Sequence, residues 1–445
     1  MKSVACRPGD VIVAKNSEQP NFQNIALRLG TVFVPSSPID SEDLFCGRNA
    51  QIRDVVDAIN QKGRHAILYG ERGVGKTSLG KILQTKLKAI EPVPITSPLI
   101  TCDSSDNYSS IWNKAFEAIG IEGYGVEEKS DELTGAIISI LGTPDVTPHD
   151  VRKKLEEAGR AGILYVIIDE FEKISDETSR KLIADTIKLL SDHATPATIV
   201  VIGVAEDVTG LIKDHSSIER CLAHVPMPRM PREELEQIVK KGLKSVGMTA
   251  DQDALLEISG LSKGLPHYTH MLALNAARSA LDRCLLNVTS DDVESAVKCA
   301  IRQGQESIRT DYDKATYSTR KETLYEAVLL ACSMAETDEF GRFQPANVVE
   351  PLRRITGTKL STDRFGTHLK VFCDEDRGPV LVRTGGEYRW KYRFKTPLMQ
   401  PFVMMKGLAA GQISKDDLHL MQDASGQKRM PFSGPLDSSV PPQPS

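Results

Sequence analysis

A glycine-rich segment that follows an apolar run carries the clearest chemistry of the chain. Its letters are GERGVGKT, from Gly70 to Thr77, with the spacing Gly-x4-Gly-Lys-Thr. In such a segment the glycines let backbone N–H groups wrap a phosphate chain, the lysine reaches the β- and γ-phosphates, and the threonine hydroxyl binds Mg²⁺. A glycine turn that only resembles this pattern is the alternative. The predicted nucleotide contacts are Gly70, Glu71, Arg72, Gly73, Val74, Gly75, Lys76, Thr77 and Ser78, with Lys76 also catalytic.

Two acidic residues directly after a second apolar run complete the expected site. The run Ile163–Ile168 is followed by Asp169 and Glu170. A carboxylate at the end of a strand beside the phosphate loop can hold Mg²⁺ together with Thr77, and the next carboxylate can orient and deprotonate a water. We therefore predict Asp169 as a metal ligand and Glu170 as the catalytic base, or alternatively as the cap of the following helix. The sequence lacks a guanine-specific Asn-Lys-x-Asp motif, which favours ATP as the nucleotide.

The elements that position these residues alternate between strands and helices. His65–Tyr69, Leu99–Cys102, Ile163–Ile168 and Thr198–Ile202 are short runs that are apolar throughout, and helical patterns lie between them. Strands of this kind belong to a parallel sheet that is buried on both faces. The expected fold class is therefore α/β, with a P-loop NTPase core.

The pattern changes after this core, and five parts are expected. Helical segments follow Pro231, and from Thr323 the order is helix, proline-interrupted segment, helix and two strands, as a winged helix requires. The end of the chain is rich in Ser, Pro, Gly and Asp, which is typical of disorder. The predicted parts are an N-terminal strap (1–44), an ATPase core (45–230), an α-helical lid (231–315), a winged helix (316–405) and a disordered tail (406–445).

Several segments together resemble the AAA+ superfamily, and within it the initiator-type origin-recognition ATPases and the related STAND NTPases. Besides the two motifs above, LFCGR at Leu44–Arg48 is similar to the box that precedes the phosphate loop in that group. VVIGVAED at Val200–Asp207 resembles the sensor-1 strand, and GLPHYTHML at Gly264–Leu272 resembles the start of the lid helix that carries sensor 2.

The resemblance implies three further site residues. The sensor-1 position is Glu206, where relatives usually have Asn or Thr, and the sensor-2 position is His267 rather than arginine. Glu206 could instead cap a helix, and His267 could be a packed lid residue. An arginine finger acting on a neighbouring subunit is expected at Arg220, with Arg229 and Arg232 as rivals. A finger implies that the protein forms a homo-oligomer.

The C-terminal third is locally basic. Residues 340–395 contain twelve Lys or Arg and six Asp or Glu. A winged helix usually places one helix in the major groove of DNA and the cations of its wing on phosphates. Predicted DNA contacts are Arg364, Lys370, Arg389, Lys391 and Arg393. The alternatives are a rigid protein adaptor or a solvated strand face, and the aromatic residues that alternate with these cations suit core positions.

Composition agrees with a globular chain, since 40% of residues are hydrophobic and 26% charged, with a net charge of −5. No apolar stretch of about eighteen residues and no secretory signal pattern is visible, so we predict a cytoplasmic protein without a membrane partner. Two functions are expected from these patterns. One is a self-assembling ATPase that acts on DNA. The other is a STAND-like switch in which ATP controls a protein effector, for example in anti-phage defence.

Overall fold

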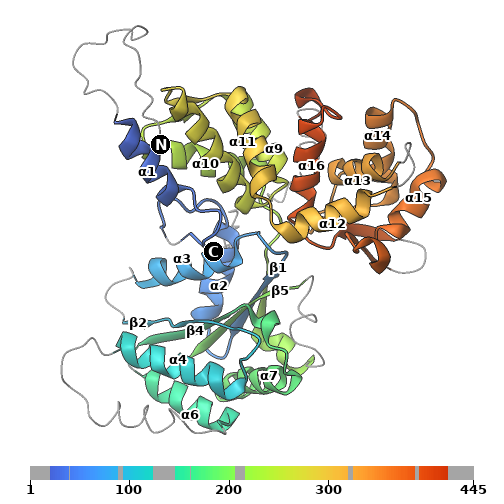
Figure 1. Ribbon diagram of the computed structural model, residues 1–445. Coiled ribbons are helices and arrows are strands. Elements are labelled where there is room, and N and C mark those ends of the chain that lie inside the picture. Colours follow the sequence, from blue (N-terminus) through green and yellow to red (C-terminus); the bar gives the residue numbers. More distant parts are fainter. Residues whose placement is uncertain are drawn as a thin grey trace, which may run out of the picture.

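The computed structural model describes residues 21–39, 41–88, 94–123, 146–160, 162–205, 216–318, 324–385 and 390–418. Its first half is a parallel sheet between helices, and its second half is helical apart from short strands (Figure 1). The predicted α/β class with a P-loop core is confirmed. None of the described helices is both long enough and apolar enough to span a membrane.

The sheet has the order β2-β4-β5-β1-β6, and β3 also pairs with β4. All of these pairs are parallel, with Ile67 opposite Val201 and Leu68 opposite Val225. Because β1 and β4 are neighbours of β5 and run in the same direction, their carboxyl ends meet at one edge. The strands are β1 (His65–Gly70), β2 (Ile95–Thr96), β3 (Leu99–Thr101), β4 (Ile163–Asp169), β5 (Thr198–Val204) and β6 (Leu222–Pro226).

Successive strand residues face two different apolar cores. Ile67 and Val166 pack with α4 (Tyr108–Gly123), α6 (Pro148–Ala158) and α7 (Glu177–Asp192). Leu68 and Ile167 belong to a core on the other face, which also contains α2 (Asn49–Ile59) and α3 (Lys76–Lys88). Burial on both faces explains why these strands are apolar throughout.

The start of α6 is fixed by contacts within its own first turn. The side chain of Thr147 accepts a hydrogen bond from the amide of Asp150, the Asp150 carboxylate accepts one in return, and Pro148 opens the helix. These bonds satisfy amides that the first turn leaves unpaired.

A helical lid follows the sheet. It consists of α8 (Arg232–Ser245), α9 (Gln252–Ser262), α10 (Pro266–Asp282) and α11 (Ser290–Gln303), with the short strands β7 (Thr249–Ala250) and β8 (Asn287–Val288). The segment predicted as an N-terminal strap contains a helix, α1 (Phe22–Val32), which packs on α8 and α10. A Cβ at Gly242 of α8 would come within 2.4 Å of the Phe33 ring, so this close approach requires glycine.

The C-terminal part has the element order predicted for a winged helix. The antiparallel pair β9–β10 follows three helices, and a bridge between Phe343 and Tyr392 extends it. A final helix, α16, was not predicted; it crosses the expected boundary at residue 406 and packs on α11 and α13. The elements are α12 (Glu306–Thr316), α13 (Tyr325–Met334), α14 (Pro345–Thr356), α15 (Thr362–Val371), the 3₁₀ helix η4 (Glu375–Arg377), β9 (Leu381–Thr384), β10 (Lys391–Phe394) and α16 (Met399–Ala409).

Candidate nucleotide site

The phosphate loop lies between the end of β1 and the start of α3. Gly73 and Gly75 have φ values of 89° and 92°, a region that favours glycine. A Cβ built on Gly75 would meet no atom within 4 Å, so the loop backbone borders open space there. The ammonium of Lys76 is buried and donates to the carbonyls of Gly70 at 3.0 Å and Glu71 at 2.8 Å. Burial lowers the pKa of Lys76 to about 8.

Asp169 ends β4 beside this loop. Its Oδ1 accepts a hydrogen bond from the Glu170 amide at 2.8 Å. Its Oδ2 is buried and has no hydrogen-bond partner in the described part of the chain. Burial raises the pKa of Asp169, and the nearby hydroxyl of Thr77 opposes that shift. A buried carboxylate oxygen and a hydroxyl at one place are the kinds of oxygen ligand that Mg²⁺ prefers, so these residues fit the predicted metal.

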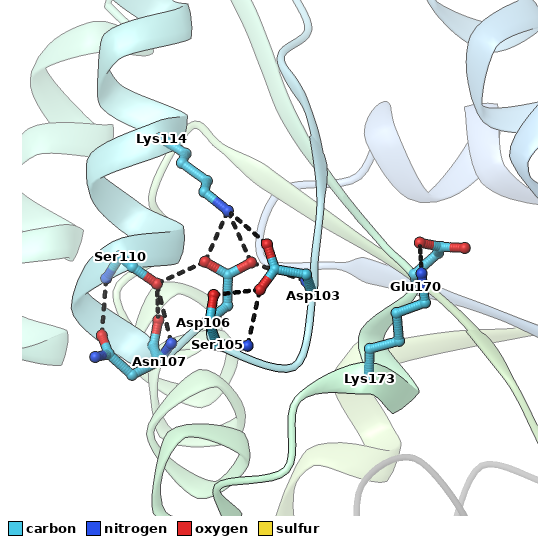
Figure 2. Close-up of polar contacts among 8 residues, drawn as sticks. All are labelled: Asp103, Ser105, Asp106, Asn107, Ser110, Lys114, Glu170 and Lys173. Carbon is cyan, nitrogen blue, oxygen red and sulfur yellow. Dashed lines mark hydrogen bonds and ion pairs between the residues drawn. The ribbon is translucent and has the colours of Figure 1, made fainter.

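Glu170 occupies the left-handed region, with φ 56°, directly before the 3₁₀ helix η1 (Phe171–Lys173). Its carboxylate makes no capping hydrogen bond to η1. Instead it pairs with Lys173 at 2.5 Å, and Figure 2 shows both side chains. The alternative role of Glu170, as the side-chain cap of the following helix, is therefore not seen in this structure.

The loop that follows β3 packs against this region. The amide of Cys102 donates to the Asp169 carbonyl at 2.9 Å. Figure 2 shows the Lys114 ammonium between the carboxylates of Asp103 and Asp106, at 3.7 Å and 2.7 Å. The Lys114 ammonium offsets part of the charge of the two carboxylates, and these contacts fix the loop.

A cavity of about 340 Å³ opens between these elements. Five segments line it: residues 34–39, the phosphate loop with Thr77 and Ser78, Asp169–Lys173 without Phe171, the end of β5, and the start of α10. Two hydrogen bonds between the segments that line the cavity were not predicted. The amide of Ile39 donates to the Ser78 hydroxyl at 3.1 Å, and Glu172 accepts from the Val204 amide at 2.9 Å. Both depend on contacts between distant segments, which no local motif signals.

Of the two residues predicted as sensors, the structure describes only His267. His267 lines the cavity, and its Nδ1 lies 2.7 Å from the carbonyl of Pro35. Burial lowers the pKa of His267, which disfavours the imidazolium form, so this ring does not replace the fixed positive charge of an arginine. Glu206 lies outside the described residues.

Two of the predicted phosphate-loop contacts have side chains that face away from the cavity. The Glu71 carboxylate is buried and accepts from Arg229 at 2.7 Å. The side chain of Val74 belongs to the apolar core, and its carbonyl accepts from Arg48 at 3.0 Å. Arg48, from the LFCGR segment, also donates to the carbonyl of Pro228 at 2.7 Å. These contacts fix the phosphate loop on the side that faces away from the cavity. The loop side chains that line the cavity are those of Arg72, Lys76, Thr77 and Ser78.

The three arginine-finger candidates differ in exposure. Arg220, in the 3₁₀ helix η3 (Ser216–Cys221), is 76% exposed and pairs with Asp192 at 3.0 Å. It precedes β6, whose first residue pairs with the first residue of β1, so it lies at the opposite end of the sheet from the phosphate loop. Arg232 is 35% exposed and pairs with Glu236. Arg229 is only 8% exposed and is held within its own chain, which removes it as a candidate finger.

The residues predicted to contact DNA also differ in their exposure to solvent. Arg364 and Lys370 on α15 are exposed. Lys391 pairs with Asp338 at 3.0 Å, Arg393 is partly buried, and Arg389 lies outside the described residues. Tyr392 and Phe394 are buried, as their alternation with the cations predicted. The exposed cations therefore lie on α15 rather than on β10.

The family model for Novel STAND NTPase 1 matches residues 38–338. The chain belongs to this family. This confirms the predicted resemblance to a STAND-related P-loop ATPase.

Other known proteins are similar at lower levels. RuvB, a Holliday junction branch migration complex subunit of Bifidobacterium longum strain DJO10A, is 23% identical over an alignment of 277 residues that covers 59% of this chain and 69% of that protein. A Walker-type ATPase of Pyrococcus abyssi has 15% identity and a TM-score of 0.49, over 84% of this chain and 99% of that one. The ORC1 protein of Aeropyrum pernix, solved in complex with DNA, has 15% identity and a TM-score of 0.45, and the match covers 86% of this chain and 97% of that one.

Replacing Arg229 with methionine should destabilise the protein by about 3 kcal/mol or more, because the buried Glu71 carboxylate would lose its countercharge. Arg232→Met is the matched control. Its pair with Glu236 is partly solvated, so we expect a loss below about 1 kcal/mol. Urea unfolding of both variants measures the difference, and equal losses would contradict a structural role for Arg229.

Proposed function

We propose that the protein binds ATP with Mg²⁺ in the 340 Å³ cavity and hydrolyses it. The observation that carries this proposal is the buried Oδ2 of Asp169, which lacks a partner in the described chain and lies beside the phosphate loop. Thr77 and Asp169 would hold Mg²⁺, which would neutralise phosphate charge during the reaction. The Lys76 ammonium would exchange backbone carbonyls for phosphate oxygens.

Glu170 would orient the attacking water and accept its proton. In the structure its carboxylate is occupied by Lys173, but both side chains are partly exposed, at 36% and 47%. Separating such a solvated pair costs below about 1 kcal/mol. The pairing is therefore compatible with a base that becomes free when substrate is bound.

Lys76→Ala and Glu170→Gln should separate binding from turnover. Loss of the Lys76 ammonium should weaken ATP binding by about 3 kcal/mol, or roughly 100-fold, because a buried cation no longer meets the phosphates. Glu170→Gln should keep the affinity and lower kcat by about 100-fold or more, since the amide cannot accept the proton. Calorimetric titration and phosphate release measure the two effects. Lys81→Ala, on the same helix but outside the cavity lining, is the control. Undiminished turnover in Glu170→Gln would assign the base elsewhere.

We further propose that the chains assemble so that Arg220 of one subunit reaches the nucleotide site of the next. Its exposure and its distance along β6 from its own phosphate loop support action in trans. A cation so placed would stabilise the charge of the transition state.

Mixing two inactive variants tests this arrangement. Arg220→Ala and Lys76→Ala subunits should each have low turnover, whereas a mixture should regain activity because some interfaces combine an intact Lys76 with an intact Arg220. Arg220→Ala breaks only one exposed ion pair, so the fold should be unaffected. Phosphate release is measured across mixing ratios, and native mass spectrometry counts the mixed assemblies. Mixed assemblies without recovery would refute a finger at Arg220.

For the partner, we propose DNA bound through α15. Arg364 and Lys370 are exposed on this helix, where phosphate contacts would be sequence-independent. The double variant Arg364→Gln/Lys370→Gln should bind duplex DNA more weakly and reduce the slope of log K against log salt by about 2. Lys298→Gln, an exposed lysine on α11, is the control. Fluorescence anisotropy at several salt concentrations measures both quantities, and an unchanged slope would exclude α15 as the DNA surface.

A STAND-like switch that controls a protein effector is the second candidate. The observation in its favour is that Arg229 binds both Glu71 of the phosphate loop and the side chain of Gln400 in α16, at 2.7 Å and 2.5 Å. The position of the C-terminal part is thus tied to the nucleotide site. Absence of DNA binding by the wild-type protein would favour this candidate.

A further inference from the structure

A second cavity, of about 500 Å³, lies between the lid and the C-terminal part of the chain. It is lined by the end of α9, the segment between α13 and α14, α14 itself and α16, and Figure 1 shows α16 between α9 and α13. It shares no lining residue with the nucleotide cavity. Its size is in the range of small-molecule sites, which often lie between domains.

The walls of this second cavity are partly apolar. Met230, Met334, Met404, Pro351 and Leu418 contribute to the lining from five separate segments of the chain. Methionine side chains adapt to the shape of a bound molecule. These walls suit an apolar molecular body of moderate size.

Most charged groups around the cavity already have partners. Asp338 accepts from Arg342 at 2.9 Å and from Lys391 at 3.0 Å. Glu350 pairs with Arg353 and Arg354 at 2.8 Å and 3.3 Å. Arg229 and Arg232 bind Glu71 and Glu236, while Glu336 is exposed to solvent at the rim.

Lys263 is the exception among the charged lining residues that the structure describes inside the rim. It ends α9 with φ 50°, it is partly buried, and its ammonium has no carboxylate partner in the described chain. Burial, aided by repulsion from Arg229, lowers the pKa of Lys263 to about 8. An uncompensated cation at a cavity wall is unfavourable, and an anion bound beside it would remove that cost.

We propose that this second cavity is a ligand site for a small molecule with one anionic group and an apolar body, and that the anionic group pairs with the Lys263 ammonium. The proposal does not depend on ATP binding or hydrolysis.

The site is connected to the nucleotide cavity by two short paths. Arg229 lines the second cavity, donates to the Lys263 carbonyl at 3.4 Å and holds Glu71 of the phosphate loop. Lys263 is also followed directly by the Gly264–Pro266 turn that opens α10, where His267 lines the nucleotide cavity. A ligand at Lys263 would thus act on groups that position both the loop and the lid.

The fluorescent anion 8-anilino-1-naphthalenesulfonate tests the site, because it combines a sulfonate with an apolar ring system. The chain of residues 1–445 should bind one molecule per chain with saturation. Lys263→Met should weaken binding at least about tenfold, whereas Lys263→Arg should retain it, since only the first variant removes the charge. Lys298→Met, at an exposed lysine outside the cavity, should bind as the wild type does. Circular dichroism of each variant verifies that the fold is kept.

A neutral probe of similar shape, N-phenyl-1-naphthylamine, distinguishes charge pairing from apolar adsorption. It should bind the wild type and Lys263→Met equally. Equal affinity of the sulfonate for these two proteins would overturn the proposal, as would failure of the wild type to saturate. Competitive displacement of the sulfonate by ATP in the wild type, with no displacement in Lys76→Ala, would place the probe in the nucleotide cavity and also overturn it.

Discussion

The buried ion pair between Glu71 and Arg229 is the interaction on which the positions of the three parts of the chain depend. Its carboxylate belongs to the phosphate loop, and its guanidinium follows the last strand of the sheet. The same guanidinium meets Gln400 of α16, which in turn donates to the carbonyl of Ser333 in α13. Because a buried charge without its partner costs several kcal/mol, separation of Arg229 from the phosphate loop is strongly unfavourable.

Much of the nucleotide site could be predicted because its signals are local. The Gly-x4-Gly-Lys-Thr spacing and the acidic end of an apolar strand each lie within eight residues, and the geometry of P-loop folds brings them together. The orientation of Glu71 could not be predicted, because its partner lies 158 residues later. Arg229 was instead considered as a finger, since sequence position alone does not reveal burial.

Two helices of the structure, α1 and α16, were not predicted. α1 is short and buries Leu29 and Val32 against the lid, while α16 is apolar nearly all round because it packs between other helices. α16 therefore lacks the amphipathic stripe of a surface helix, whereas in α1 the apolar residues Phe22, Ile25, Leu29 and Val32 do recur at helical spacing. Conversely, the exposed positions of Arg364 and Lys370 followed from the helical pattern, whereas the pairing of Lys391 with Asp338 required the fold.

The contact between Ile39 and Ser78 has a consequence for how the ATPase core can be isolated. Residues 34–39 form one wall of the nucleotide cavity, and α1 just before them is seated on the lid through Phe33 and Gly242. A shortened chain that starts at the first motif of the core, near Phe45, would keep every phosphate-loop residue. It would nevertheless leave the cavity open on one side and expose apolar surface of α8. A fragment meant to keep this cavity closed should therefore begin at α1, before the segment Leu44–Arg48.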